Sequence, residues 1–206
     1  MIKNILFIIE RKIKIFYWRM KLKNKDFTII TNNCWGGRVY EELNLPFNTP
    51  FIGLYLYAED YLTVIKNLKQ YMEMDLYFTQ TSRFKQDYDN SYPVGNLGGV
   101  ELHFVHYSSE VEALEKWNRR KQRINYDNLF VKFNDDNQCT YEHLKEFDSL
   151  DLNHKVIFSA TNYPELKSLV FFKETRPLNS STVGEDLEYY HKYFDVAKWL
   201  NEGVES

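Results

Sequence analysis

The chain has 206 residues, of which 44% are hydrophobic and 17% aromatic, and these values predict one domain with a substantial core. Its two cysteines, Cys34 and Cys139, are too few and too far apart for a disulfide framework or a structural zinc site, and they predict a reducing, cytoplasmic compartment. The net charge of −3 argues against nucleic acid as a partner of the whole protein.

Charge is unevenly distributed along the chain. Residues 1–25 carry eight Lys and Arg and one Glu, whereas the remainder carries 18 basic and 28 acidic residues. Within residues 1–23, apolar side chains recur at steps of three and four, which predicts a basic amphipathic helix. The stripe consists of Ile2, Leu6, Ile9, Ile13, Phe16 and Met20. The apolar run is too short for a signal peptide or a membrane span. Two roles remain open: packing on protein, or peripheral contact with the inner face of the membrane.

Residues 24–206 are predicted to form a single domain in which strands and helices alternate. The predicted strands are 26–31, 76–79, 100–106, 129–133, 155–160 and 169–172, with 51–57 as a strand or a buried loop. The predicted helices are 38–43, 58–74, 109–124, 140–147 and 185–200, and residues 80–99 are predicted as a long loop. This order predicts a three-layer α/β/α fold with a mostly parallel (mixed) sheet and helices on both faces.

The segment Asn-Asn-Cys-Trp-Gly-Gly, which follows the first predicted strand, is the leading candidate site. Ligands of open α/β sheets bind beyond the carboxyl ends of the strands. The two glycines would leave amide groups open at a helix N-terminus, where the dipole also favours a cysteine thiolate. The asparagines could donate to an oxyanion or phosphate, and the tryptophan could form a pocket wall. The structural alternative is a tight turn. The candidate residues are Asn32, Asn33, Cys34, Trp35, Gly36 and Gly37.

A second candidate is the strand that contains Glu101, His103 and His106. Alternation places Glu101 and His103 on one face, which indicates an edge strand or a polar pocket. His106 would share a sheet edge with Cys34 if their strands were parallel, and a Cys–His pair is a plausible activated nucleophile with a histidine as base. The alternative is a structural histidine. No metal site is predicted, because the alternation separates the two histidines.

A third candidate is the basic end of the helix at 109–124. Two of its arginines lie four residues apart and could hold a phosphate in bidentate fashion. The alternative is a solvated helix face. The candidate substrate-binding residues are Arg119, Arg120, Arg123 and Asn125.

Seven segments of the chain together carry a resemblance to a known family. They are 27–37, 50–54, 60–62, 92–95, 101–107, 117–120 and 123–129. Over roughly residues 20–200 the chain resembles a bacterial family labelled as exopolysaccharide biosynthesis proteins, under domain of unknown function 1919. The resemblance implies a three-layer α/β/α fold and a role in capsule or surface-polysaccharide synthesis. The Asn-Cys dipeptide also resembles the Gly-Asn-Cys-Gln segment of polysaccharide acetyltransferases that bind coenzyme A.

Two functional hypotheses follow. The first is a cytoplasmic transferase for acyl or glycosyl groups that acts on a polysaccharide precursor and takes a sugar, nucleotide-sugar or acyl-donor ligand. The second is a non-catalytic binding or scaffold module of the polysaccharide machinery at the membrane surface. The cofactor, the substrate and the reaction type are left open by the sequence.

Overall fold

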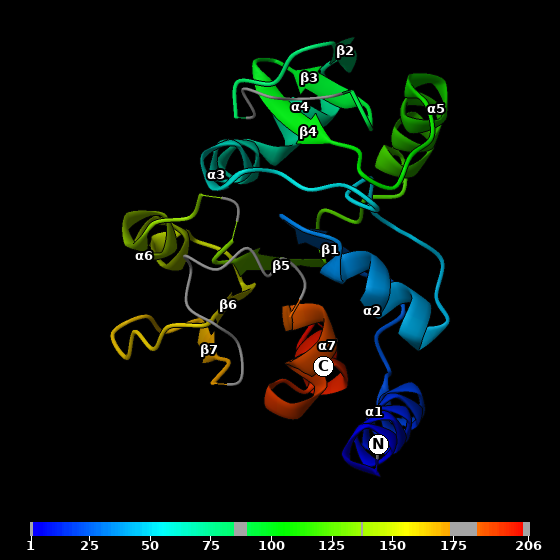
Figure 1. Cartoon of the computed structure of the whole chain (residues 1–206), viewed down its shortest axis with the longest axis vertical. Helices are drawn as coiled ribbons and strands as arrows, with labels where there is room; N and C mark the ends of the chain where they lie inside the picture. The colour runs from blue at the N-terminus through cyan, green and yellow to red at the C-terminus, as the bar shows by residue number, and fades with distance from the viewer. Residues whose placement is uncertain (1, 85–89, 137, 174–184, 204–206) are drawn as a thin grey trace.

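The computed structural model describes residues 2–84, 90–136, 138–173 and 185–203, and it is built around a four-stranded parallel sheet (Figure 1). The strand order is β1-β5-β6-β7. The strands are β1 (Thr28–Thr31), β5 (Leu129–Asn134), β6 (His154–Ser159) and β7 (Leu169–Phe171). All four residues of β1 are buried, as expected for a parallel strand that is covered on both faces.

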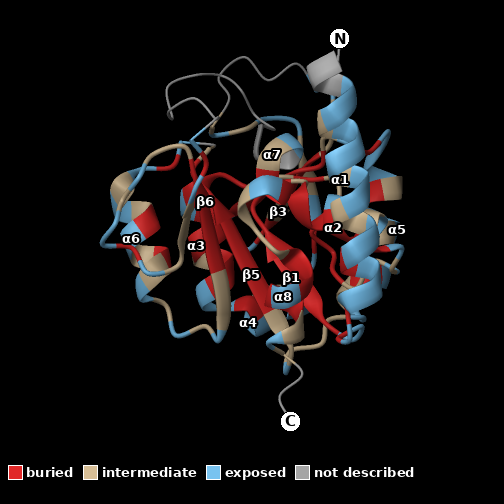
Figure 2. Cartoon of the chain, turned by 90° about the horizontal axis from the view of Figure 1, so that it is seen from below, coloured by how far each residue is buried: buried red, intermediate tan, exposed pale blue. Residues whose placement is uncertain are grey.

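Helices cover both faces of this sheet. One face packs against α1 (Ile2–Lys21), α2 (Trp35–Leu43), α7 (Glu185–Tyr193) and α8 (Val196–Asn201). The other face packs against α3 (Ala58–Lys66) and α6 (Tyr141–Ser149), with α4 (Leu68–Glu73) and α5 (Glu110–Lys121) beyond them. The buried strands lie between the two helical layers in Figure 2. The predicted α/β class and the layered arrangement are therefore confirmed.

A second, antiparallel sheet lies beside α3 and α5 (Figure 1). It contains β2 (Tyr77–Thr79), β3 (Val94–Leu97) and β4 (Val100–His103) in that order. The prediction of one long loop over 80–99 was wrong for 94–97; its residues 85–89 lie outside the described part. Strand β3 is hard to recognise because it contains glycine, yet Gly95 is required there: a Cβ would lie 2.6 Å from Leu76 Cδ1.

Two predicted helices are each divided into two. The predicted helix 58–74 is interrupted at Asn67, whose φ of −133° is not helical. The predicted helix 185–200 is interrupted before Asp195, whose side chain accepts a hydrogen bond from Lys198 N at 3.1 Å and begins α8. Asp195 is a preferred helix-capping residue type, so a new helix begins there.

Helix α2 begins at Trp35, three residues earlier than predicted. The Asn33 side chain accepts a hydrogen bond from Trp35 N at 3.1 Å, which satisfies one of the amides that a helix start leaves without an intrahelical acceptor. Gly36 and Gly37 consequently lie in the first helical turn rather than in a loop.

Helix α1 confirms the predicted N-terminal helix and packs on its own domain. Trp18 is buried and stacks on Tyr190 of α7, while Arg11 forms an ion pair with Glu42 of α2. Over the described part of the chain, none of the helices combines the length and the apolar character needed to cross a bilayer.

Candidate functional site

The two asparagines that follow β1 form hydrogen bonds that connect β1 with β5 and with the start of α2. Asn32 is fully buried; its Oδ1 accepts from Asn134 N at 2.9 Å, and its Nδ2 donates to Asn134 O at 3.2 Å. This pair of hydrogen bonds fixes the carboxyl end of β1 to that of β5. Asn33 accepts hydrogen bonds from Trp35 N and from Lys132 Nζ. The Asn32 side-chain amide, which was expected to donate to a ligand, therefore donates within the protein, and the Asn33 side-chain oxygen likewise accepts within the protein.

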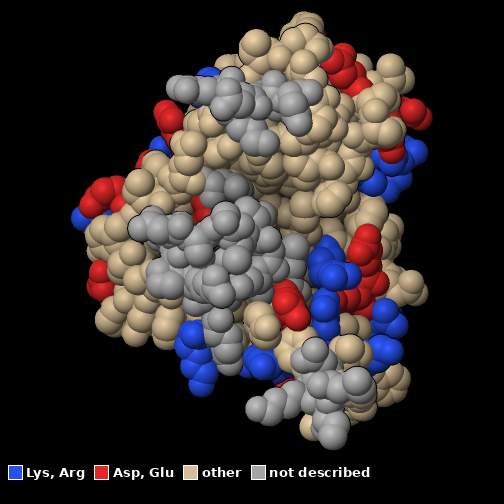
Figure 3. Space-filling view, in the orientation of Figure 1, with Lys and Arg blue, Asp and Glu red and all other residues tan. Residues whose placement is uncertain are grey.

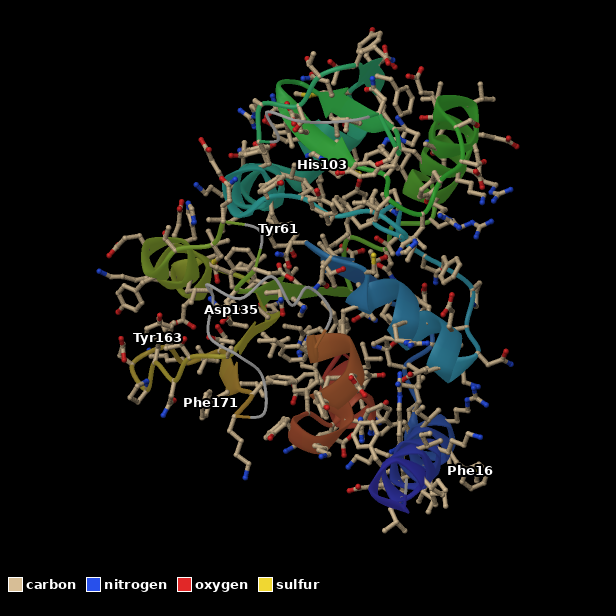
Figure 4. All side chains as sticks on the ribbon, in the orientation of Figure 1. Phe16, Tyr61, His103, Asp135, Tyr163 and Phe171 are labelled. Atoms are coloured by element: carbon tan, nitrogen blue, oxygen red, sulfur yellow. The ribbon has the colours of Figure 1, made fainter. Side chains whose placement is uncertain are left out.

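A buried lysine lies at this edge of the sheet, and the sequence reasoning missed it. Lys132 Nζ is 3.2 Å from Asn33 Oδ1 and 3.0 Å from Asn134 Oδ1, and it lies 5.0 Å from the ring centroid of Phe158. Asp135, labelled in Figure 4, accepts from Ser159 Oγ at 2.6 Å. The available signal was a lysine within an otherwise apolar central strand, where charged residues are rare.

Cys34 lies on a cavity of about 470 Å³ at the N-terminus of α2. Residues from four separate segments form its walls. The lining residues are Cys34, Gly37, Arg38, Glu41, Phe47, Ile52, Gly53, His106, Tyr107, Lys116 and Arg120. The cavity falls within the usual size range of small-molecule sites. It brings together four sequence-predicted candidates, Cys34, Gly37, His106 and Arg120.

Cys34 and His106 line the same cavity, although not through the parallel strands on which the prediction was based. Their strands are not parallel neighbours, because β4 belongs to the antiparallel sheet. His106 reaches the cavity because its backbone N–H donates to Gly53 O at 3.1 Å. Gly53 has φ +69°, and a Cβ there would lie 3.2 Å from His106 Cβ, so glycine is what permits the two loops to approach.

Three cations and one carboxylate border the cavity. Arg120 is buried; its Nη1 donates to Tyr107 Oη at 2.7 Å, and its guanidinium lies 5.0 Å from the ring centroid of Phe47. Lys116 and Arg38 also line the cavity, together with Glu41. Figure 3 shows basic and acidic side chains side by side over α2. Lys116 forms an ion pair with Glu112, and Arg38 lies 3.8 Å from Glu42, so the buried Arg120 near the N-terminus of α2 is the cation that favours an anionic ligand.

Tyr107 holds the buried arginine in place. Burial raises the pKa of Tyr107, and the nearby Arg120 opposes this effect without cancelling it. The Tyr107 hydroxyl is consequently neutral at physiological pH. It therefore keeps the proton with which it donates to Ile52 O at 2.6 Å, while its oxygen accepts from Arg120. The guanidinium has its remaining N–H groups for a ligand.

Glu101 and His103 lie in a different cluster. As predicted, they share one face of β4, and β4 is an edge strand of its sheet. Glu101 accepts from Arg83 N at 2.9 Å, and the buried ring of His103, labelled in Figure 4, stacks on Tyr55 with centroids 4.6 Å apart. Neither residue is among those that line the Cys34 cavity.

The other predicted site residues lie in the core or on the surface. Trp35 is fully buried, and Gly36 faces Thr31. Asn125 donates to Asp26 O at 3.1 Å and so supports the start of β1. Arg119 and Arg123 are exposed, and Arg123 donates to Phe47 O at 3.2 Å. Of the three predicted arginines, only Arg120 lines the cavity.

Within the described ranges, no three His, Cys, Asp or Glu side chains converge in a way that could hold a metal ion. Neither Cys34 nor Cys139 forms a disulfide. Burial raises the pKa of the Cys139 thiol, with Asp135 and Asp136 adding to the effect, so this cysteine is an unreactive thiol.

We predict that Asp60, which lies next to Glu101 and Arg83, makes the stability of the protein depend measurably on pH. Burial raises the pKa of Asp60 above its ordinary value, despite its ion pair with Arg83 and the hydrogen bond from Glu101 N. The folded state therefore binds a proton more tightly than the unfolded state. The stability from Asp60 is complete below about pH 4 and is lost as pH rises through the raised pKa.

Urea denaturation of the unchanged chain and of Asp60→Asn, repeated from pH 4 to 7, measures this contribution. We expect the free energy of unfolding of the unchanged chain, relative to the variant, to decrease as pH rises, because asparagine does not ionise. A difference that stays constant or increases over this range would contradict the assignment.

The fold and the cavity define a class: an α/β protein whose cation-lined cavity lies where the first strand of a parallel sheet leads into a helix. The chain belongs to the family described as Domain of unknown function (DUF1919), whose model matches residues 5–201. It is also 39% identical over 188 residues to a protein of Haemophilus influenzae described as "Uncharacterized protein". The aligned region covers 88% of this chain and 87% of the relative. The predicted family is thus confirmed, and its link to exopolysaccharide synthesis stays a prediction.

Proposed function

We propose that the protein is a cytoplasmic transferase of capsule or exopolysaccharide synthesis that binds a phosphorylated donor in the Cys34 cavity. The observation that carries the proposal is the convergence of a thiol, an imidazole and three cations on one cavity. A phosphorylated donor, either a nucleotide sugar or a coenzyme A thioester, supplies the negative charge that these cations would bind.

Each cavity residue has a role that its chemistry supports. Arg120, held by Tyr107, is the principal phosphate ligand, because guanidinium binds phosphate oxygens in bidentate geometry. Arg38 and Lys116 add charge to the same cavity. Aromatic faces of Phe47 and Tyr107 provide surface for a sugar or a base.

The acyl form of the reaction uses Cys34 as nucleophile. Its sulfur attacks the carbonyl carbon of a thioester donor, His106 accepts the thiol proton, and the donor thiolate leaves with that proton. A sugar hydroxyl then attacks the carbonyl carbon of the Cys34 thioester and gives its proton to His106. The sugar ester forms as the C–S bond breaks, and His106 returns the proton to the leaving thiolate, which restores the thiol. In the glycosyl form the cations bind the diphosphate leaving group, and Cys34 only positions the sugar.

The test is a binding titration with two matched arginine variants. Arg120→Met removes the buried cation, whereas Arg119→Met makes the same change at the exposed position next to it. We expect Arg120→Met to weaken donor binding about 10- to 100-fold, since a hydrogen bond to a charged group contributes about 1.5–3 kcal/mol. Arg119→Met is expected to leave the affinity unchanged.

Calorimetry with a coenzyme A thioester and with a nucleotide sugar, in separate titrations, distinguishes the acyl from the glycosyl form. If neither donor binds the unchanged chain at millimolar concentration, or if both arginine variants bind equally well, the cavity is not a donor site. The circular dichroism of both variants controls for folding.

A further inference from the structure

The described part of the predicted apolar stripe, from Leu6 to Met20, lies on the outer side of α1, away from the domain. Figure 2 shows much of the described part of this helix in the colour of exposed residues, and Figure 4 shows Phe16 pointing away from the body of the protein. The exposed fractions are 60% for Leu6, 64% for Ile13, 66% for Phe16 and 70% for Met20. A contiguous apolar surface of this kind on a solvent-exposed side of a helix indicates an interaction site.

The opposite side of α1 is fixed to the domain, so the helix cannot simply turn its stripe inward. Trp18 and Leu22 are buried, and Arg19 Nε donates to Glu42 O at 2.6 Å. Just beyond the helix, the Asn24 side chain donates to Leu200 O at 2.7 Å. Packing against the domain thus accounts for one face of the amphipathic pattern and leaves the larger apolar face in solvent.

Basic residues lie along both edges of this exposed stripe. At 3.6 residues per turn, Lys12 falls on one edge, and Lys21 falls toward the other together with Lys14, which lies 3.8 Å from Asp195 of the domain. Glu10 is the one acidic residue in the helix sequence. Such a face, apolar in the centre and cationic at its edges, complements an anionic lipid surface in both hydrophobicity and charge.

A groove beside α1 repeats this combination on a smaller scale. Its walls are apolar side chains of the helix together with cations from α1 and α7, over a volume of about 830 Å³. The lining residues are Leu6, Ile9, Glu10, Ile13, Lys14, Tyr17, His191 and Lys192. Acyl chains against the apolar wall would place lipid phosphates near the two lysines.

We propose that α1 binds parallel to the surface of an anionic lipid bilayer, with Leu6, Ile13, Phe16 and Met20 inserted between the headgroups. The helix has 20 residues and is therefore about 30 Å long, enough for a continuous line of contact. A protein partner of matching shape is the less favoured occupant, because the two cationic edges require an acidic surface on both sides of an apolar groove. This inference does not depend on the proposed transfer reaction.

Vesicle flotation with the full chain tests the proposal. Vesicles of phosphatidylcholine alone are compared with vesicles that also contain phosphatidylglycerol, at low and at high salt. We expect the chain to float with the anionic vesicles, to bind the neutral ones weakly, and to dissociate as salt rises. Failure to bind the anionic vesicles at low salt would overturn the proposal.

Matched variants locate the contact. The double variant Ile13→Gln with Phe16→Gln is expected to lose about tenfold or more in vesicle affinity, because two inserted side chains are replaced by polar ones. The control is Val111→Gln on α5, where the valine is 76% exposed. The charge pair Lys12→Gln with Lys21→Gln is compared in the same way with Lys145→Gln and Lys167→Gln, all at exposed positions.

Sedimentation velocity excludes the competing occupant. If the unchanged chain is a dimer that Ile13→Gln with Phe16→Gln converts to a monomer, the stripe is a self-association surface and the proposal is wrong. Equal vesicle binding by the stripe variant and by Val111→Gln would also overturn it. Unchanged melting temperatures for all variants would exclude unfolding as the cause of lost binding.

Discussion

Replacing Trp35 by alanine is expected to lower the free energy of unfolding by about 3–5 kcal/mol, the range observed for large aromatic side chains removed from a core. The indole ring is fully buried, and its centroid lies 5.2 Å from that of Phe158, 5.5 Å from Tyr190 and 6.0 Å from Trp199. This cluster joins α2 to β6, α7 and α8, so its loss would loosen one entire helical layer.

Chemical denaturation with two comparison variants measures the effect. Trp35→Phe retains most of the apolar volume and is expected to lose less stability than Trp35→Ala. Tyr77→Ala removes an aromatic ring that is 67% exposed and is expected to change stability by less than about 0.5 kcal/mol. If Trp35→Ala remained stable and lost only ligand binding, Trp35 would be a pocket wall, as the sequence alone suggested.

The roles within the 32–37 segment explain why its function is hard to read from sequence. Asn32 and Trp35 are architectural, whereas Cys34 and Gly37 border the cavity. All four belong to one short run of the chain and have residue types that suit a catalytic loop equally well. Only the burial of each side chain, which depends on distant strands and helices, separates the two groups.

Helices could be predicted where their sequence signal comes from residues close together in the chain. Helix α5, predicted to begin at 109, is capped there by Ser109, whose Oγ accepts from Glu112 N at 3.2 Å. The period of α1 was equally clear, but a period does not say which side of a basic helix meets the domain. The burial of Trp18 and Leu22 depends on contacts with α7 and α8, which are far away in sequence.

The cavity shows the same limit of sequence-based prediction, here for residues that lie far apart in the chain. Cys34 and His106 were predicted to meet at the edge of one sheet, and they line one cavity through the loop around Gly53 instead. The spacing favoured Arg119 and Arg123 as a phosphate clamp, whereas the structure places Arg120 at the cavity, where it donates to Tyr107. Which arginine of a helix faces a cavity is decided by the elements packed beside it.

The cavity and the exposed stripe are linked by position. Arg38 borders the Cys34 cavity and also a groove at α1 that Arg11 and Lys12 line. This groove lies on the side of α1 that faces the domain, so the cavity and the stripe belong to opposite sides of the same helix.

Replacing Cys34 by alanine is expected to reduce transfer activity by about 10³-fold or more if the acyl form of the reaction is correct, because removal of a nucleophile leaves only binding and oxyanion stabilisation. Cys139→Ala is the matched control, since it removes the other thiol, which is buried and lies outside the cavity. Donor affinity is expected to be nearly unchanged in Cys34→Ala, because the cations remain.

The measurement combines product detection with complementation. Mass spectrometry follows acyl or glycosyl transfer to a polysaccharide precursor in vitro, and the surface polysaccharide of a deletion strain is compared after complementation with each variant. Suppose that Cys34→Ala complements the deletion strain fully and that the chain lacking residues 1–23 does not complement it. This pair of results would refute catalysis by the thiol and favour a scaffold held at the membrane. Loss with Cys34→Ala and retention with Cys139→Ala would assign the chemistry to the thiol at the start of α2.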